Sequence, residues 1–445
     1  MDTADGKSTL SLSDLSDDAL LIIFDSLRVH ELLKMEHMHS RIKANIGYVL
    51  KHRSCLITQD LRSNESAKTT FNLRSVLERF DGDHLTRFDF NLMPYQDKKK
   101  KPVKGHELAH DFPNIVDFGS LNQRSLEFVS NYVDATLLTS LETLHFVPTI
   151  TADKKMSSGD YYRNMDDLSS LVKQVKIKNL YVDLRKSTGD YNRSIKIESC
   201  LQDIVVDSCV DHLYIKADEN DMALNNFLWV MASLHGAEKL KQSKLKGLDL
   251  GTAEPSFSEL CIELLSNLEH IGGGFEFVRW INDAFQFDDD VNELFPKLTS
   301  LALRSTTSGG AVRDTYLIQS FAKIGYHLEK LSLVIKNSIK TWPLEQMIVQ
   351  CPNLVALQVY TQGDFDITFL AGLEHLKILG IWSKSAAQFW EILTVCPKLK
   401  RLAVYALSED AAMMKALYQK QIKATRPDLV VRFNRGFSDF VNDDL

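Results

Sequence analysis

The sequence predicts an α/β fold in which a short three-helix module precedes a curved solenoid with a concave parallel sheet and outer helices. Three observations predict it. A strand-like phrase, apolar at its first, fourth and sixth positions, recurs along most of the 445 residues. Proline-containing tetrapeptides punctuate the phrase in a constant phase, and helix-like runs lie between its copies. Units of this kind bury their apolar faces only by stacking on one another.

The recurring phrase is clearest at 399–404, LKRLAV, where alternation at the end is typical of a strand with one buried face. Other copies begin at residues 85, 115, 141, 177, 210, 245, 298, 328, 354 and 376. Their spacing of roughly 22 to 36 residues fits a leucine-rich repeat. The copy at 268–271 runs into Gly272-Gly273-Gly274 and is expected to lose its strand. The segment 429–433 is expected to cap the sheet.

Four tetrapeptides mark the start of a strand after a helix. They are Phe112-Pro113-Asn114-Ile115, Phe295-Pro296-Lys297-Leu298, Cys351-Pro352-Asn353-Leu354 and Cys396-Pro397-Lys398-Leu399. Proline drives the residue before it out of helical geometry, so the helix-like runs at 344–349 and 390–395 should end there. Cys351 and Cys396 occupy equivalent positions, and we expect both to be small buried apolar residues.

An ordinary doubly wound α/β domain also alternates strands with helices. Such a domain does not repeat one strand phrase so many times, which favours the solenoid.

The first fifty residues follow a different pattern. Ser16 is suited to cap a helix, and Asp17 and Asp18 suit its positive end. Apolar residues then follow at helical spacing in three short runs: Leu20, Ile23, Phe24 and Leu27; Leu32 and Met35; Ile42, Ile46 and Val49. Three helices this short bury little, so they need a partner surface or docking on the solenoid.

The segment 12–27, LSDLSDDALLIIFDSL, with Glu31-Leu32-Leu33 behind it, resembles an F-box. The family pattern is L-x-x-L-P-x-[DE]-x-L-L-x-x-I-F-x-x-L, then an acidic–Leu pair, then V-C-x-x-W. The chain departs from it in the third helix and at the proline: Ser16 replaces Pro, Met38-His39 replaces Val-Cys, and Ile42 stands at the Trp position.

An F-box followed by leucine-rich repeats resembles the substrate receptors of SCF-type cullin-RING ubiquitin ligases. The resemblance implies a non-catalytic subunit without cofactor, which binds a SKP-type adaptor, and a cullin through it, and holds a protein substrate on the repeats for ubiquitination. The residues that match the adaptor-binding motif are Leu15, Leu20, Leu21, Ile23, Phe24, Leu27 and Leu32, some of which are expected to pack inside the module. The alternative is a leucine-rich-repeat interaction scaffold without a ubiquitin role, whose first helices only cap the solenoid.

This resemblance and the repeats together predict the domain organisation. The F-box-like module covers 8–55, a connecting helix or linker 56–84, the solenoid 85–434, and an acidic mobile tail 435–445.

Residues that alternate with the leucines should face the concave side. The seventh position of three consecutive copies holds Tyr360, Trp382 and Tyr405, which would form an aromatic ladder suited to substrate binding. Gln358, Arg401, Arg304 and Lys330 are expected at nearby outward positions. Equally, the rings could contact one another and only stabilise the sheet. A more polar outward set is expected earlier in the chain, at Asn179, Tyr181, Asp183, His212, Tyr214 and Lys216.

His106-Glu107-Leu108-Ala109-His110 matches the H-E-x-x-H zinc motif, which on a helix would place two imidazoles and a general base on one face. The context disfavours it. Pro102 and Pro113 leave little room for a helix, and the segment aligns with the repeat helices before Cys351 and Cys396. A zinc metallopeptidase is therefore a distant alternative, and no metal site is expected.

The formal net charge of −7 and the pI of about 6.0 argue against a nucleic-acid or anionic-membrane partner, although a local basic face is compatible with both values. The acidic N-terminus does not resemble a secretory signal, and no apolar stretch is long enough to span a bilayer. The six cysteines are scattered and form no disulfide framework. These features favour the cytoplasm, the nucleus, or both. The run 98–104, KKKKPVK, is either a nuclear import signal or a solvated loop.

Overall fold

A computed structural model of the chain describes residues 12–57, 76, 78–89, 114–121, 138–147, 168–184, 200–207, 210–216, 238–252, 262–275, 277–278, 295–305, 314–335, 344–361, 366–382, 386–405, 413–416, 418, 420, 423 and 426–434. The chain divides into two compact units, Met1–Gly189 (unit 1) and Asp190–Leu445 (unit 2).

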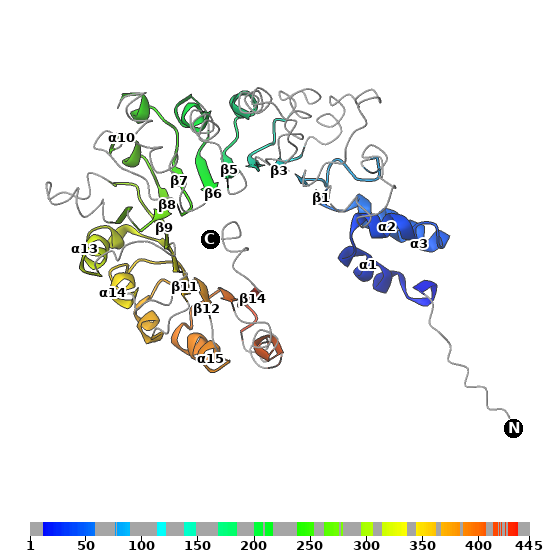
Figure 1. The fold of residues 1–445 in the computed structure, drawn as a ribbon. Helices are drawn as coiled ribbons and strands as arrows, with labels where there is room; N and C mark the ends of the chain where they lie inside the picture. Colours follow the sequence, from blue (N-terminus) through cyan, green and yellow to red (C-terminus); the bar gives the residue numbers. More distant parts are fainter. Residues whose placement is uncertain are drawn as a thin grey trace, which may run out of the picture. The chain divides into compact units, whose positions relative to one another are not determined.

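Unit 1 begins with a short 3-10 turn and three helices and continues as a parallel sheet (Figure 1). Its elements are η1 (Leu12–Asp14), α1 (Asp17–Ser26), α2 (Val29–Met35), α3 (Ser40–Lys51), β1 (Cys55–Ile57), β2 (Arg87–Asp89), β3 (Asp117–Leu121), β4 (Thr143–Phe146) and β5 (Asn179–Asp183). The five strands pair in sequence order, each parallel to the next.

Unit 2 is a run of parallel strands with helices outside. Its strands are β6 (His212–Lys216), β7 (Gly247–Asp249), β8 (His270–Gly274), β9 (Ser300–Ser305), β10 (Lys330–Ile335), β11 (Ala356–Thr361), β12 (Ile378–Trp382), β13 (Arg401–Tyr405) and β14 (Val430–Asn434). Its helices are α10 (Ile262–Leu265), α13 (Asp314–Ile324), η5 (Gly325–His327), α14 (Leu344–Ile348), η6 (Thr368–Gly372) and α15 (Ala386–Val395). These strands also pair in sequence order, on the inner side of an arc whose outer side carries the helices (Figure 1). The predicted α/β solenoid is confirmed.

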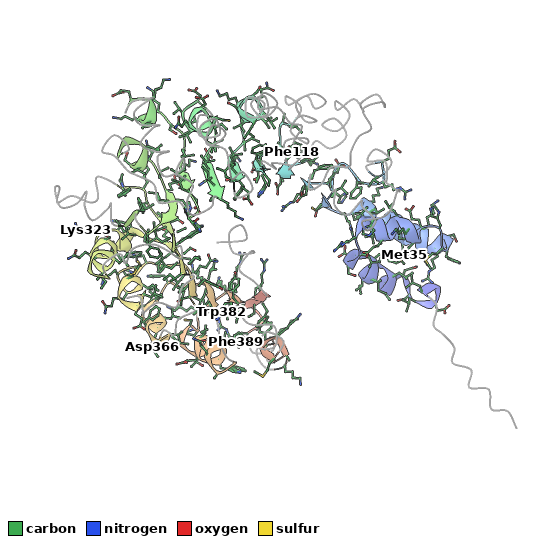
Figure 2. The ribbon with its side chains drawn as sticks, viewed as in Figure 1. Met35, Phe118, Lys323, Asp366, Trp382 and Phe389 are labelled. Atoms are coloured by element: carbon green, nitrogen blue, oxygen red, sulfur yellow. The ribbon has the colours of Figure 1, made fainter. Side chains whose placement is uncertain are left out.

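The in-register strands explain why the leucines of the phrase recur. Leu402 on β13 lies opposite Leu379 on β12, which lies opposite Leu357 on β11, and all three side chains are buried. Each column of apolar residues is closed from outside by helices. Phe389 of α15 (Figure 2), for example, is fully buried. Its ring centroid lies 5.8 Å from that of Phe433 on β14. Stacked repeats thus share one continuous core.

The tetrapeptides have a structural role that the repeat pattern alone does not reveal. In each, the polar third residue donates a hydrogen bond to the turn of the preceding repeat. The four bonds are Asn114 to the Asp83 carbonyl (3.4 Å), Lys297 to Asn267 Oδ1 (3.1 Å), Asn353 to the Tyr326 carbonyl (2.8 Å) and Lys398 to the Glu374 carbonyl (3.2 Å). The polar residue therefore fastens successive turns at the edge of the sheet.

Both tetrapeptide cysteines are buried, as predicted. Burial raises the pKa of the Cys351 thiol to about 12. Burial also raises the pKa of Cys396, to about 11, against the opposing charge of Arg426. Both thiols are therefore protonated at neutral pH and serve as packing groups.

Two expectations about the strands are wrong. The glycine-rich copy does form a strand, because β8 pairs with β7 as far as Gly272 and with β9 as far as Gly274. In addition, the sheet begins earlier than residue 85, since β1 at Cys55–Ile57 already pairs with β2. The copy that begins at Ile115 forms a strand as predicted, since β3 pairs with β2 and with β4.

The His106–His110 motif, the basic run 98–104 and the tail 435–445 lie outside the described residues. Among the residues that are described, no helix combines the length and the apolar character needed to cross a bilayer.

Candidate functional site

The N-terminal module is held together by a small apolar core and by polar contacts at its helix ends. Ser16 caps α1 by accepting a hydrogen bond from the Ala19 amide at 3.3 Å. Asp17 accepts from Arg41 at 2.8 Å and from Asn45 at 2.9 Å, which ties α1 to α3. The Asn45 and Arg41 hydrogen bonds hold the pKa of Asp17 below its usual range. These contacts fix the start of α1 against α3.

The structure sorts the seven adaptor-motif residues into two groups. Leu20, Phe24 and Leu32 are fully buried and form the core of the module. Leu15, Leu21, Ile23 and Leu27 are only half-buried and contribute to its surface. The first group sets the shape of the module, and only the second is available for contact with another protein.

One exposed apolar residue was not among the predicted contacts. Ile22 lies on α1, two residues from the buried Leu20 and from the buried Phe24, so it points away from the core and is 75% exposed. Its place opposite Leu20 and Phe24 on a helical wheel could have identified it from the sequence.

On the solenoid, the register aligns outward residues of neighbouring strands into rows across the concave face of unit 2. We call Lys330, Ala356, Ile378 and Arg401 the Lys330 row; each belongs to the next strand along, from β10 to β13. Lys330 and Arg401 are exposed, Ile378 is half-buried and Ala356 is buried. The row thus has a cation at each end and an apolar middle.

The predicted aromatic ladder exists as a packed cluster. Val334, Tyr360, Trp382 and Tyr405 form this aromatic cluster on adjacent strands. The Tyr360 and Trp382 rings meet edge to face, with centroids 5.2 Å apart. Tyr360 and Tyr405 are buried and Trp382 is half-buried. Of the three rings, Trp382 therefore offers the most surface to a partner, and the contacts between rings match the stabilising alternative.

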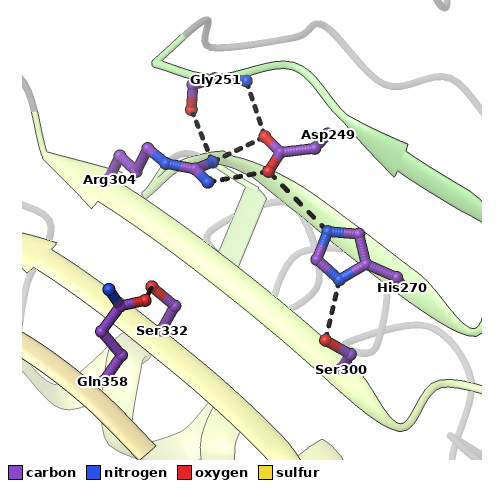
Figure 3. A network of polar contacts seen from close by, with 7 residues as sticks. All are labelled: Asp249, Gly251, His270, Ser300, Arg304, Ser332 and Gln358. Atoms are coloured by element: carbon purple, nitrogen blue, oxygen red, sulfur yellow. Dashed lines mark hydrogen bonds and ion pairs between the residues drawn. The ribbon is translucent and has the colours of Figure 1, made fainter. Parts of the chain in front are cut away.

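Gln358 and Arg304 lie on the concave face but make contacts within the chain. Gln358 is buried, and its Oε1 accepts a hydrogen bond from the Ser332 hydroxyl at 2.9 Å. Arg304 binds both carboxylate oxygens of Asp249, at 2.6 and 2.8 Å, and donates to the Gly251 carbonyl at 3.3 Å (Figure 3). Neither side chain is free to serve as a first contact for a substrate.

Asp249 is the centre of this polar network. Burial alone would raise the pKa of its carboxyl, but the charge of Arg304, the hydrogen bonds that Arg304 donates and the nearby His270 ring, whose Nε2 lies 3.8 Å from Oδ2, outweigh burial and hold the pKa well below its usual range. His270 in turn shares a 2.8 Å hydrogen bond with the Ser300 hydroxyl (Figure 3). The network ties β7, β8 and β9 together on the concave side.

Glycines create the space that this network occupies. A Cβ on Gly272 would lie 2.3 Å from Cγ of Asp249, and one on Gly247 would lie 2.2 Å from Nδ1 of His212. The same arrangement occurs in unit 1, where a Cβ on Gly119 would lie 2.9 Å from Cγ of Asp89. A side chain on one strand thus lies over a glycine on the next.

The more polar outward set behaves as predicted in both units. Outward positions on β5 and β6 are half-buried and alternate with buried core positions. On β6, His212 and Tyr214 stack, with ring centroids 6.1 Å apart. The Tyr214 ring centroid also lies 5.9 Å from that of His270. Burial, followed by the charge of His270, lowers the pKa of His212. Its Nδ1 is buried without a hydrogen-bond partner.

Among the described residues, no group of three or more His, Cys, Asp or Glu side chains is placed to hold a metal ion. The candidate site comprises two surfaces: the exposed and half-buried apolar residues of α1 in unit 1, and the Lys330 row with the aromatic cluster in unit 2.

Comparison with known proteins finds no matching family and no matching curated protein. Among solved structures, a chain of the yeast Rad7–Elc1 complex is similar, with 13% identity, a TM-score of 0.44, and coverage of 93% of this chain and 92% of that one. An internalin, inlF, from Listeria monocytogenes has 14% identity, a TM-score of 0.27, and coverage of 70% of this chain and 84% of that one. Values this low carry no argument about function.

Proposed function

We propose that this chain is the substrate-recognition subunit of an SCF-type ubiquitin ligase. In this role the N-terminal module binds a SKP-type adaptor, and a cullin through it, while the concave face of the solenoid holds a protein substrate for ubiquitination. The observation that carries the proposal is the N-terminal module itself, in which the F-box-like motif forms three helices around Leu20, Phe24 and Leu32.

The surface of the module supports this role. Ile22 exposes a large apolar side chain on α1, and the half-buried Leu21 and Ile23 flank it in sequence. Met38, just beyond α2, is also 64% exposed. A module with so small a core gains stability when a partner covers such residues.

The role required of such a subunit is to position the substrate. It would hold a substrate close to a charged conjugating enzyme, which makes the transfer effectively intramolecular. No side chain of the subunit needs to act on a bond. The cytoplasm or the nucleus would be the place of action.

Co-purification with a SKP-type adaptor tests the proposal. The wild-type chain is expected to co-elute with the adaptor, and Ile22→Asp is expected to abolish co-elution without unfolding, because the side chain is already exposed. Val349→Asp is the matched control, since Val349 is an exposed apolar residue of unit 2. Absence of co-elution for the wild type, or capture unchanged by Ile22→Asp, would contradict the proposal.

A second function, an interaction scaffold whose helices cap the solenoid, is favoured by the contacts at the end of the module. Arg53, two residues before β1, donates to the carbonyls of Phe24, Asp25 and Leu27 at the end of α1. Glu36, which ends α2, is buried and forms an ion pair with the exposed Arg79. These bonds fasten the helices to the chain that follows, as a cap requires. The same co-purification separates the two functions.

A further inference from the structure

The concave face of unit 2 differs in charge from the chain as a whole. Among its described strands, the outward positions hold a single acidic residue, Asp249, which Arg304 neutralises. The remaining charged outward residues are all basic: Lys216, Lys330, Arg401 and Arg432. The chain itself carries a net charge of −7. Cations gathered on one face of an acidic protein favour an acidic partner there.

The Lys330 row indicates how such a partner would be bound. Lys330 and Arg401 stand at its ends, both are exposed, and within the described part of the chain neither belongs to an ion pair. Ile378 and Ala356 lie between them. Three strand spacings of about 4.8 Å separate the two cations, or about 14 Å.

An extended peptide spans this distance in about four residues, at about 3.3 Å per residue. Because side chains of an extended peptide alternate between its faces, residues i, i+2 and i+4 would all face the sheet. Acidic residues at i and i+4 would then meet Lys330 and Arg401. An apolar residue at i+2 would lie over Ile378, which is the first residue of β12.

We propose that the concave face over β10–β13 binds an extended acidic segment of a protein partner, with carboxylates four residues apart and an apolar residue between them. The wide separation of the two cations favours two carboxylates over one phosphate, which a cluster of arginines would hold more tightly. This inference names the partner chemistry of the substrate surface and so rests on the proposed function.

Fluorescence anisotropy on the purified full chain, without adaptor, tests the inference. The probe is a fluorescein-labelled peptide, Ser-Gly-Glu-Ser-Leu-Ser-Glu-Gly-Ser. It is expected to bind the wild type and to bind Lys330→Gln/Arg401→Gln about tenfold more weakly. Lys239→Gln/Lys244→Gln, which removes the same charge from exposed residues before β7, is expected to leave binding unchanged. Circular dichroism verifies that both variants are folded.

Three further peptides complete the test. Lys in place of both Glu residues should abolish binding, and a three-residue Glu spacing, which puts the carboxylates on opposite faces, should weaken it. A third peptide carries one phosphoserine and Gln in place of the Glu pair, and should bind more weakly than the probe. The inference is overturned if the Lys peptide binds equally well, if spacing has no effect, if the phosphoserine peptide binds more tightly, or if Lys330→Gln/Arg401→Gln binds like the wild type.

The two proposals fail in different ways. Loss of adaptor co-elution with peptide binding retained would leave an acidic-segment scaffold. Adaptor capture without selection for the acidic peptide would remove only the further inference.

Discussion

Arg304 on β9 forms a two-pronged ion pair with Asp249 on β7, although β8 lies between these strands. The contact is possible because the middle strand carries Gly272 at the position opposite Asp249. A Cβ there would lie 2.3 Å from Asp249 Cγ. A glycine in a strand thus provides the space for a buried charge pair.

Gly272→Ala should therefore destabilise the protein. The added methyl group must displace the Asp249 carboxylate from Arg304 or distort the strand, which we expect to lower the free energy of unfolding by about 2 kcal/mol. Urea unfolding measures the loss, and hydrogen exchange of the β7–β9 amides locates it. Gly372→Ala is the control, because nothing lies within 4 Å of a Cβ at that position. Equal effects of the two substitutions would contradict this account.

Arg304→Ala should destabilise the protein by roughly 3 to 5 kcal/mol, because it leaves a buried carboxylate unpaired. Removing both charges with Asp249→Asn/Arg304→Ala should recover much of that loss. A double-mutant cycle by urea unfolding measures the coupling. Additive single substitutions would show that the ion pair contributes no coupling energy.

The ion pair between Asp249 and Arg304 predicts that the stability of the protein depends on pH in acid. The pKa of Asp249 is depressed in the folded chain, so its stabilising contribution is complete above its unfolded pKa of about 3.9 and is lost as pH falls below it. The urea midpoint of the wild type should therefore fall between pH 4 and pH 2. Asp249→Asn should show a shallower fall, and an identical slope would contradict the prediction.

His212 should make the protein less stable in mild acid. Because its pKa is lowered by burial and then by the charge of His270, the unfolded chain takes up a proton first as pH falls through about 6.5. Stability should therefore drop between pH 7 and pH 5. His212→Gln should flatten the urea midpoint over this range, with His375→Gln, an exposed histidine before β12, as the control for losing a histidine. An unchanged slope in His212→Gln would assign the drop to other groups.

Asp117→Asn should stabilise the protein at neutral pH. Burial, assisted by the charge of Asp89 and opposed by that of Arg87, raises the pKa of Asp117, and its Oδ1 has no hydrogen-bond partner. The charged form is thus disfavoured in the fold, and the cost appears as pH rises above about 3.9. We expect a gain of about 1 kcal/mol at pH 7 that disappears below pH 4. Thermal unfolding measures this gain, and Asp83→Asn, at an exposed residue, is the control. A loss of stability in Asp117→Asn would contradict the prediction and would mean that the contact with Arg87 dominates.

The sequence by itself determined the repeat, its strands and its helices, because alternation of leucines and the proline at each helix end are local signals. It also determined the three N-terminal helices, through the Ser16 cap and the helical spacing of Leu20 and Phe24. The same local reasoning failed at β8, where glycines normally weaken a strand. Only the structure shows that Gly272 is needed by a carboxylate from the neighbouring repeat.

Only the tertiary structure decided which outward residues a partner could reach. Tyr360, Gln358 and Arg304 occupy outward positions of their strands, as predicted, yet each makes contacts with residues of neighbouring strands. Lys330 and Arg401 remain exposed in the same sheet. Alternation along a strand fixes which face a side chain takes, whereas its neighbours across the sheet decide whether it stays available, and those neighbours are many residues away in the chain.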